Sequence, residues 1–153
     1  MKNVLIASDH AGFRMKEKLK PYLQKKGYAV KDLGTYSTQR CDYPATAYAL
    51  AKEISQKRYA RGVLICKTGI GNSIVANRLP GVRASLCYNY SAAKLTREHN
   101  DSNVLVLASA FVTLPQAKRI AGVWLVTPFA GGRHQRRLNQ IKAIEKDIRK
   151  WTV

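Results

Sequence analysis

The chain has 153 residues, of which 46% are hydrophobic and 24% are charged. These values are typical of a globular protein that buries a core, and they argue against a disordered chain. No apolar run approaches the length of about 18 residues that a membrane-spanning helix needs, and the run at 4–7 is too short for a signal peptide. We therefore expect a single soluble domain over residues 1–153 and no contact with a membrane.

The net charge is strongly positive, because 27 Lys and Arg residues face only 9 Asp and Glu residues. The basic residues cluster at 14–26, 52–61 and 133–150, where helical spacing would put most of them on solvated faces. Such an excess is compatible with an anionic substrate, with nucleic acid, or with a merely basic surface. Since no nucleic-acid-binding motif accompanies the clusters, we do not expect a nucleic-acid partner.

Three cysteines, Cys41, Cys66 and Cys87, are odd in number and form no C-x-x-C motif. This spacing argues against a disulfide framework and against a zinc site, and it favours the reducing environment of the cytoplasm. We expect neither a metal nor a cofactor.

Short β-favouring runs alternate with segments of helical spacing along the whole chain. In chain order the sequence predicts a strand at 4–7, a helix at 12–26, a strand at 29–33, a helix at 44–58, a strand at 62–66, a helix at 72–79, a strand at 82–87, a helix at 91–98, a strand at 103–107, a helix at 114–126 and a last helix from 133. This alternation with short connections predicts an α/β, Rossmann-like fold with a doubly wound parallel five-stranded sheet. The last helix carries an apolar stripe of Leu138, Ile141, Ile144, Ile148 and Trp151.

Ligands of open parallel sheets bind beyond the carboxyl ends of the strands. Asp9 and His10 follow the first strand, and Cys66 ends the third strand directly before a Gly-x-Gly turn that opens a helix. The free N–H groups of residues 67–71 are suited to negative charge, and we expect the same field to lower the pKa of the Cys66 thiol. From the residues alone, Cys66 is either a small buried side chain or a functional thiol. The G-x-G-x-x-G fingerprint of dinucleotide binding is absent.

Two polar clusters lie elsewhere in the chain, at 99–101 and 131–137. Arg133 and Arg137 are four residues apart, which suits either a phosphate site or a solvated helical face. His99 precedes the strand at 103–107, so in a parallel sheet it lies at the end opposite Cys66. It is therefore either structural or part of a second subunit's site, and a two-fold dimer would allow the second arrangement.

The segments SDHAG, LICKTGIGNSIVANR, REHND and GGRHQRR closely resemble the ribose-5-phosphate isomerase B family, which includes galactose-6-phosphate isomerase subunits. The resemblance runs from residue 4 to about residue 145. It implies a cytoplasmic homodimer, in some members a dimer of dimers, whose C-terminal helix serves in dimerisation. It also implies an aldose–ketose isomerase of carbohydrate metabolism, in the pentose phosphate pathway, which works through a cis-enediolate without a metal.

The resemblance also implies a role for each matching residue. Cys66 would be the base, whereas relatives that lack this cysteine use a glutamate where this chain has Asn72. Thr68 would either help to open the sugar ring or shuttle the proton between O1 and O2. Asp9 and the partner subunit's His99 would also serve ring opening. The backbone of the loop would hold the enediolate, through Lys67, Gly69, Ile70 and Gly71. The remaining substrate contacts would come from His10, Tyr43, Asn100, Arg133 and Arg137, with His10 and the two arginines of the partner subunit on the phosphate.

The chain departs from the family pattern at two positions. Lys67 stands where a glycine is usual, and it would cost about 1–2 kcal/mol if the backbone there has a positive φ. Ala110 stands where an arginine that reaches toward the substrate is usual, which bears on the identity of the sugar.

The sequence therefore predicts an enzyme that interconverts ribose 5-phosphate and ribulose 5-phosphate. One alternative keeps the chemistry but changes the sugar, to a hexose 6-phosphate such as allose or galactose 6-phosphate, or to a tetrose 4-phosphate. Another is a non-catalytic basic binding protein on the same scaffold, which would have no reason to keep a base and a ring-opening histidine.

Overall fold

The computed structural model describes residues 2–152, apart from the side chain of Thr152. A five-stranded sheet with the order β2-β1-β3-β5-β4 lies at its centre, and all neighbouring strands are parallel. The strands are β1 (Lys2–Ser8), β2 (Tyr28–Asp32), β3 (Gly62–Cys66), β4 (Ala84–Leu86) and β5 (Val104–Ala108). The predicted doubly wound parallel sheet is confirmed.

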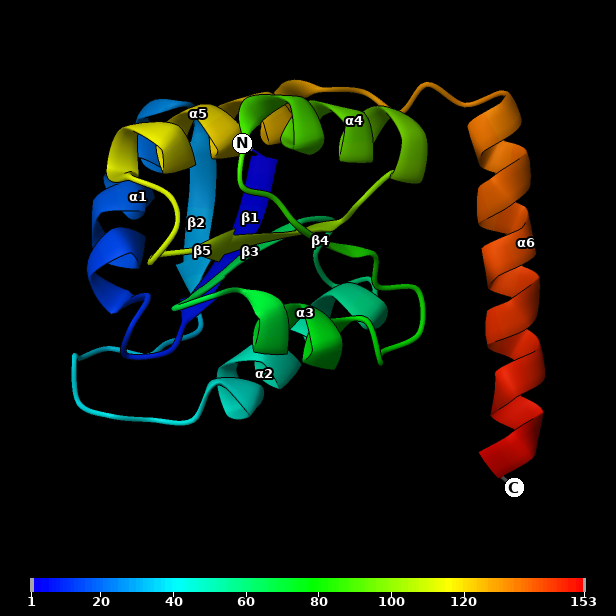
Figure 1. Cartoon of the computed structure of the whole chain (residues 1–153), viewed down its shortest axis with the longest axis horizontal. Helices are drawn as coiled ribbons and strands as arrows, with labels where there is room; N and C mark the ends of the chain where they lie inside the picture. The colour runs from blue at the N-terminus through cyan, green and yellow to red at the C-terminus, as the bar shows by residue number, and fades with distance from the viewer. Residues whose placement is uncertain (1, 153) are drawn as a thin grey trace.

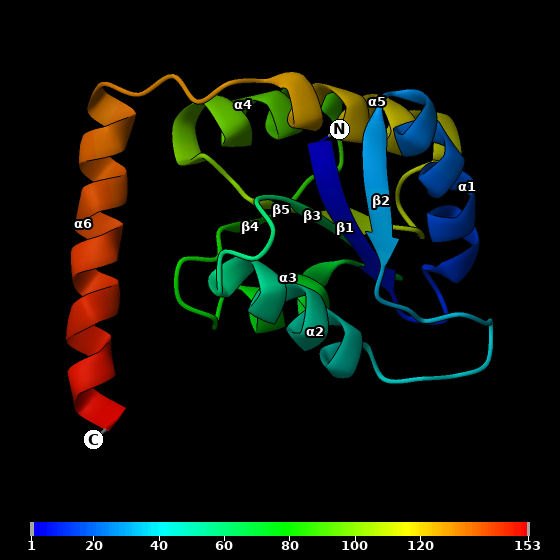
Figure 2. The ribbon, with the colours of Figure 1, turned by 180° about the vertical axis from the view of Figure 1, so that it is seen from behind.

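Helices cover both faces of this sheet (Figure 1, Figure 2). They are α1 (Phe13–Lys25), α2 (Tyr43–Ser55), α3 (Ile70–Ala76), α4 (Tyr90–Asn100), α5 (Leu114–Val126) and α6 (Arg133–Ile148), followed by a 3-10 turn η1 (Arg149–Thr152). Helices α1, α4 and α5 lie on one face and α2 and α3 on the other. None of these helices has both the length and the apolar character needed to cross a membrane.

Strands β3 and β5 are buried along their whole length, because helices cover them on both sides. Alternate side chains of β3 serve the two layers: Val63 and Ile65 pack toward α1, α4 and α5, whereas Leu64 packs toward α2 and α3. This continuous apolar run is typical of a central strand of a parallel sheet. The buried strand therefore places Cys66, its last residue, at the point where the chain leaves the core.

The turn between β1 and α1 packs directly against the end of β3. A Cβ atom at Gly12 would lie only 2.4 Å from the carbonyl oxygen of Ile65, so a larger residue would push the turn away. Glycine at this position therefore brings residues 9–12 against the strand that ends at Cys66.

One basic side chain of α1 is an exception to the expectation that most basic residues lie on solvated helical faces. Lys16 is fully buried, and its ammonium donates hydrogen bonds to Asp32 Oδ1 (2.6 Å) and Oδ2 (2.8 Å) and to the carbonyl oxygen of Thr35 (2.6 Å). Burial acts to raise the pKa of Asp32, but the hydrogen bonds from Lys16 and Lys20 outweigh it and lower that pKa. A buried ammonium is tolerated here because it is paired on several sides.

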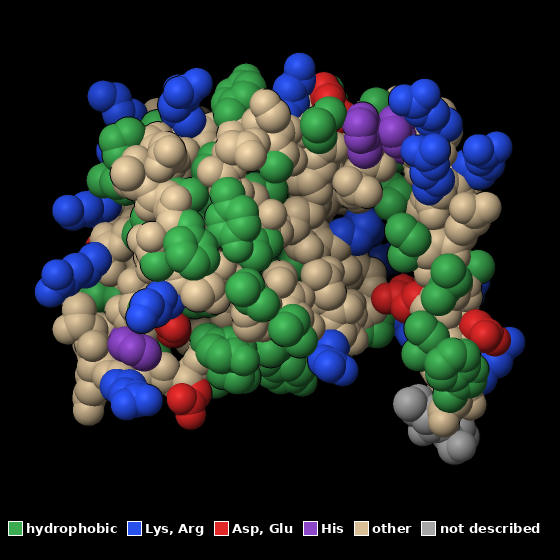
Figure 3. All heavy atoms as spheres, viewed as in Figure 1, with side chains coloured by type: hydrophobic (Ala, Val, Ile, Leu, Met, Phe, Trp, Pro, Cys, Tyr) green, Lys and Arg blue, Asp and Glu red, His purple; other side chains and the backbone are tan. Residues whose placement is uncertain are grey.

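Helix α6 stands apart from the rest of the molecule (Figure 1). A cleft of about 730 Å³ separates its inner face from the body, and Glu145 crosses it to accept a hydrogen bond from the backbone N–H of Gly81 (2.6 Å). Much of the predicted apolar stripe is uncovered, with 52% of Ile141, 58% of Ile144 and 73% of Trp151 exposed. Figure 3 shows hydrophobic side chains along the visible face of this helix.

Candidate active site

Cys66 is the last residue of β3 and lies under the turn that leads into α3. Only 4% of the residue is exposed, and its Sγ accepts a hydrogen bond from the backbone N–H of Gly69 (3.1 Å). The sequence prediction that this thiol sits at the carboxyl end of the central strand, inside the Gly-x-Gly turn, is confirmed.

The prediction that the local field lowers the pKa of this thiol is wrong. Burial raises the pKa of Cys66, and the negative charge of Asp9 acts in the same direction. The N–H groups of Gly69, Asn72 and Thr68 favour the thiolate and oppose this shift without reversing it. Desolvation of the charged form outweighs the backbone dipoles because the thiol is almost sealed from water.

The turn after Cys66 has a shape that glycine makes possible. Gly69 has a φ of +78°, and a Cβ at this position would lie 2.3 Å from the side chain of Leu86. Tyr43 packs across the next glycine, since a Cβ at Gly71 would lie 2.4 Å from the Cζ atom of its ring. Tyr43 thus borders the turn as expected. Lys67 is not among the described residues with a positive φ, so it carries none of the strain considered above.

The turn between β1 and α1 supplies the next two candidate residues. Asp9 is buried and accepts a hydrogen bond from the backbone N–H of Gly12 (2.9 Å). His10 is anchored through its Nδ1 atom, which lies 3.0 Å from the carbonyl oxygen and 3.3 Å from the amide nitrogen of Cys41. Its Nε2 atom makes no contact of this kind within the described chain, which leaves that nitrogen for a ligand.

Ser109 joins these two turns, and sequence reasoning missed it. Its hydroxyl lies 3.0 Å from the carbonyl oxygen of Ala11 and 3.2 Å from that of Cys66, so it ties the β1–α1 turn to the end of β3. The only sequence signal was a small polar residue directly after β5, and that signal is weak.

The second group of candidates lies on α4 and α6. The ring of His99 stacks on that of His134, with the centroids 4.2 Å apart and the planes at 11°. Burial lowers the pKa of His134, and the neighbouring His99, Arg133 and Arg137 lower it further. Figure 3 shows two histidine side chains together among basic ones where α6 begins. The side chains at this corner are hydrogen-bond donors that are either cationic or neutral, so the corner is suited to binding an anion.

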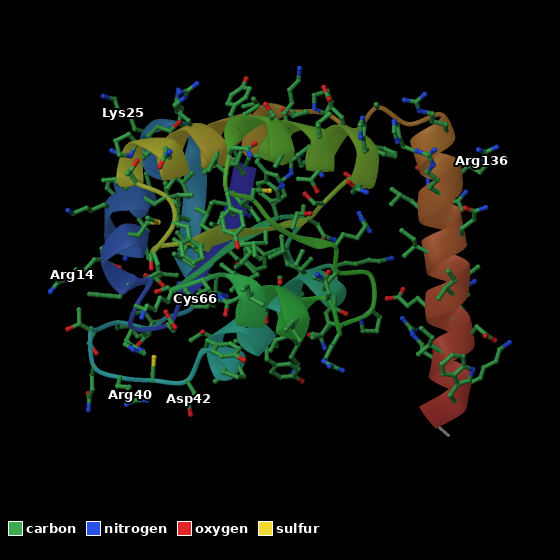
Figure 4. All side chains as sticks on the ribbon, in the orientation of Figure 1. Arg14, Lys25, Arg40, Asp42, Cys66 and Arg136 are labelled. Carbon is green, nitrogen blue, oxygen red and sulfur yellow. The ribbon has the colours of Figure 1, made fainter. Side chains whose placement is uncertain are left out.

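The two groups do not meet within one chain. Figure 4 shows Cys66 near Arg14, Arg40 and Asp42 on one side of the molecule, and Arg136, in the first turn of α6, on the far side. The structure therefore brings together Asp9, His10, Tyr43, Cys66, Thr68 and residues 67–71, and separately His99, Asn100, Arg133 and Arg137. The predicted placement of His99 at the end opposite Cys66 is confirmed. Among the described residues, no group of three His, Cys, Asp or Glu side chains is placed to hold a metal ion.

Comparison with known proteins gives consistent results over almost the whole chain. A family model described as Ribose/Galactose Isomerase matches residues 4–141. The chain is 42% identical over 146 residues to ribose-5-phosphate isomerase B of Escherichia coli, covering 95% of this chain and 98% of that protein. Two solved structures are also similar. Ribose-5-phosphate isomerase B of Clostridium thermocellum has a TM-score of 0.93 at 41% identity, covering 95% of this chain and 99% of that one. The Mycoplasma genitalium enzyme with bound ribulose-5-phosphate has a TM-score of 0.90 at 40% identity, covering 94% and 96%.

Proposed function

The chain belongs to the ribose/galactose isomerase family, and from this membership we propose that it interconverts ribose 5-phosphate and ribulose 5-phosphate through a cis-enediolate. The observation that carries the proposal is the similarity, at 40% identity over nearly the full length, to an enzyme with ribulose-5-phosphate bound. In this chain, the buried thiol at the carboxyl end of β3 is the group that can serve as the base of this reaction.

We propose Cys66 as the base. Its thiolate takes the proton from C2 of the open-chain sugar, which leaves an enediolate with its charge on O1. The Thr68 hydroxyl passes the proton of O2 to O1, and the resulting thiol returns its proton to C1 as the C2 carbonyl forms. The backbone N–H groups of residues 67–71 bind the oxygen on which charge develops. The N–H of Gly69, which already donates to Sγ, stabilises the thiolate before the transfer.

Ring opening precedes this transfer, because the sugar enters mainly as a cyclic form. Thr68 and Asp9 approach the ring from the same chain as Cys66, and the partner subunit's His99 approaches from the other side. Asn100, also from the partner subunit, binds a hydroxyl of the sugar. The stacking of His99 on His134 supports this role, because it orients the His99 ring.

The phosphate is bound between the two subunits. The anchored ring of His10 faces it from one chain, and Arg133 and Arg137 of the partner subunit supply paired guanidinium groups. Tyr43 closes the pocket beside Gly71.

A homodimer follows from this arrangement. The apolar stripe of α6 is exposed in one chain and would be buried by the same helix of the partner in a two-fold dimer. Pairing of dimers into a tetramer is compatible with such an interface. We further propose that residues 1–153 act as one cytoplasmic domain that needs no cofactor, in keeping with the three free cysteines.

A panel of sugar phosphates tests the activity and the base together. We expect the purified protein to have its highest kcat/KM on ribose 5-phosphate, above allose 6-phosphate, galactose 6-phosphate and erythrose 4-phosphate. Cys66→Ala should lose about a thousandfold or more of kcat, because general-base catalysis contributes about 10²–10⁴-fold. The matched variant Cys87→Ala, which alters a buried thiol outside the site, should keep its rate.

Two results would contradict the proposal. A higher kcat/KM on a hexose or tetrose phosphate would keep the chemistry but change the substrate. An active Cys66→Ala variant would remove the assigned base.

A further inference from the structure

Lys67 directly follows the proposed base, yet its ammonium plays no part in the fold. The residue is exposed, and within residues 2–152 its side chain makes no hydrogen bond, ion pair or ring contact. It is the one charged residue of the 66–72 turn, CKTGIGN. A free cation beside a site for an anionic substrate is a candidate for contact with that substrate.

The backbone of Lys67 is held in place at the meeting point of two loops. Its carbonyl oxygen accepts a hydrogen bond from the N–H of Ala110 (2.9 Å), and the preceding carbonyl, of Cys66, accepts one from the N–H of Ser109 (2.9 Å). Ser109 in turn reaches Ala11, the neighbour of His10 (3.0 Å). Lys67 is thus connected through two hydrogen bonds to the turn that carries the proposed phosphate ligand of this chain.

The thiol and the ammonium have different surroundings although they are adjacent in sequence. Cys66 is buried under the turn and contacts the N–H of Gly69, whereas Lys67 is exposed. The backbone N–H of Asp9 donates to the carbonyl oxygen of Ile65 (3.3 Å), so the turn that carries His10 lies against the end of β3, from which Lys67 leaves. The His10 turn is therefore a neighbour that a long, exposed cationic side chain at position 67 can approach.

We propose that the Lys67 ammonium binds the phosphate group of the substrate beside His10 and sets the enzyme's affinity for phosphorylated sugars. The inference rests on the proposed function. Ala110, whose N–H donates to the carbonyl oxygen of Lys67, has no charge on its side chain, so of these two hydrogen-bonded neighbours only Lys67 offers a cation. A lysine is suited to this because it acts as a flexible point charge on a phosphate.

Lys67→Gln tests the assignment, with Lys25→Gln as the matched control. Both lysines are exposed, and Figure 4 shows Lys25 far from Cys66. We expect Lys67→Gln to raise KM for ribose 5-phosphate and the inhibition constant of inorganic phosphate about tenfold, the effect of one hydrogen bond to a charged group. The value of kcat and its pH profile should stay the same, and the control should match the unaltered protein in every constant.

A second variant separates charge from structure. In the double variant Lys67→Gln/Ala110→Arg, we expect the inhibition constant of phosphate to return to within about threefold of the original value, because a cation is again present at this place. If the role of Lys67 were purely structural, the second substitution would not restore phosphate binding. An unchanged phosphate constant in Lys67→Gln, or a double variant as weak as the single one, would overturn the assignment. Absence of isomerase activity in the unaltered protein would overturn the proposed function instead, and calorimetry with inorganic phosphate would still decide the role of Lys67.

Discussion

The two ends of the sheet are built in different ways. At the carboxyl end, the chain itself closes the site: Cys66 is 4% exposed, Gly69 donates to its sulfur, and Asp9 is held by Gly12. At the other end, His99 and the first turn of α6 form an open basic corner, and 58% of Ile144 is exposed on the same helix.

This difference indicates which part of the proposed site one chain supplies alone and which part needs a second chain. The carboxyl end already holds the proposed base and a turn whose N–H groups can bind an oxyanion, so one chain has the groups proposed for proton transfer. The basic corner has donors for an anion and the proposed ring-opening His99, but no candidate base for the C2 proton. A two-fold axis would place the corner of one chain over the carboxyl end of the other, because an isologous interface exchanges the same two patches.

Breaking the proposed dimer should have a large effect. We expect Ile144→Asp to give monomers in analytical ultracentrifugation and to lower kcat/KM about a hundredfold, because a charge in the apolar stripe opposes its burial. Far-UV circular dichroism should stay unchanged, since this side chain is already exposed within its own chain. Ala143→Asp, on the same helix but outside the stripe, is the control. An active Ile144→Asp monomer would show that one chain holds the complete site.

A smaller effect concerns the thiol alone. Because burial raises the pKa of Cys66, the thiol is mostly protonated at neutral pH, and the thiolate fraction should grow about tenfold for each pH unit below that pKa. The rate of alkylation of Cys66 by iodoacetamide, measured by mass spectrometry of its peptide, should rise without a plateau up to the ordinary pKa of a thiol. Cys87 is the internal control, since burial raises its pKa to about 12 and should keep it unlabelled. A plateau near pH 6 would mean that the turn stabilises the thiolate more than burial opposes it.

The fold and the carboxyl end were predictable because they depend on local patterns. Alternating strands and helices determine a parallel sheet, and the bounds predicted for the strand at 62–66 and the helix at 114–126 agree with β3 and α5. The separation of His99 from Cys66 followed from the direction of the strands alone. Neither prediction depends on which side chains are in contact.

The features that escaped prediction depend on contacts between distant segments. The burial of Lys16 requires Asp32, which ends the next strand, and Thr35, which follows it. The raised pKa of Cys66 reflects the burial of the thiol in the folded chain and the nearby charge of Asp9, whereas the sequence shows only the N–H groups of its own turn. Ser109 acts through hydrogen bonds to Ala11 and Cys66, which lie 98 and 43 residues away along the chain.

The shared site is tested most directly by mixing two inactive variants. Cys66→Ala lacks the proposed base and His99→Asn lacks the proposed ring-opening group, so each homodimer should be nearly inactive on ribose 5-phosphate. In a mixed dimer, one site collects both changes and the other collects neither. Random exchange from equal amounts makes half of the dimers mixed, so about a quarter of all sites become intact by two-fold counting.

We therefore expect the mixture to regain about a quarter of the original activity, by the same counting, once native mass spectrometry shows that the subunits have exchanged. If the subunits exchange and no activity returns, His99 does not act in the partner's site, and the account of a site shared between two chains is wrong.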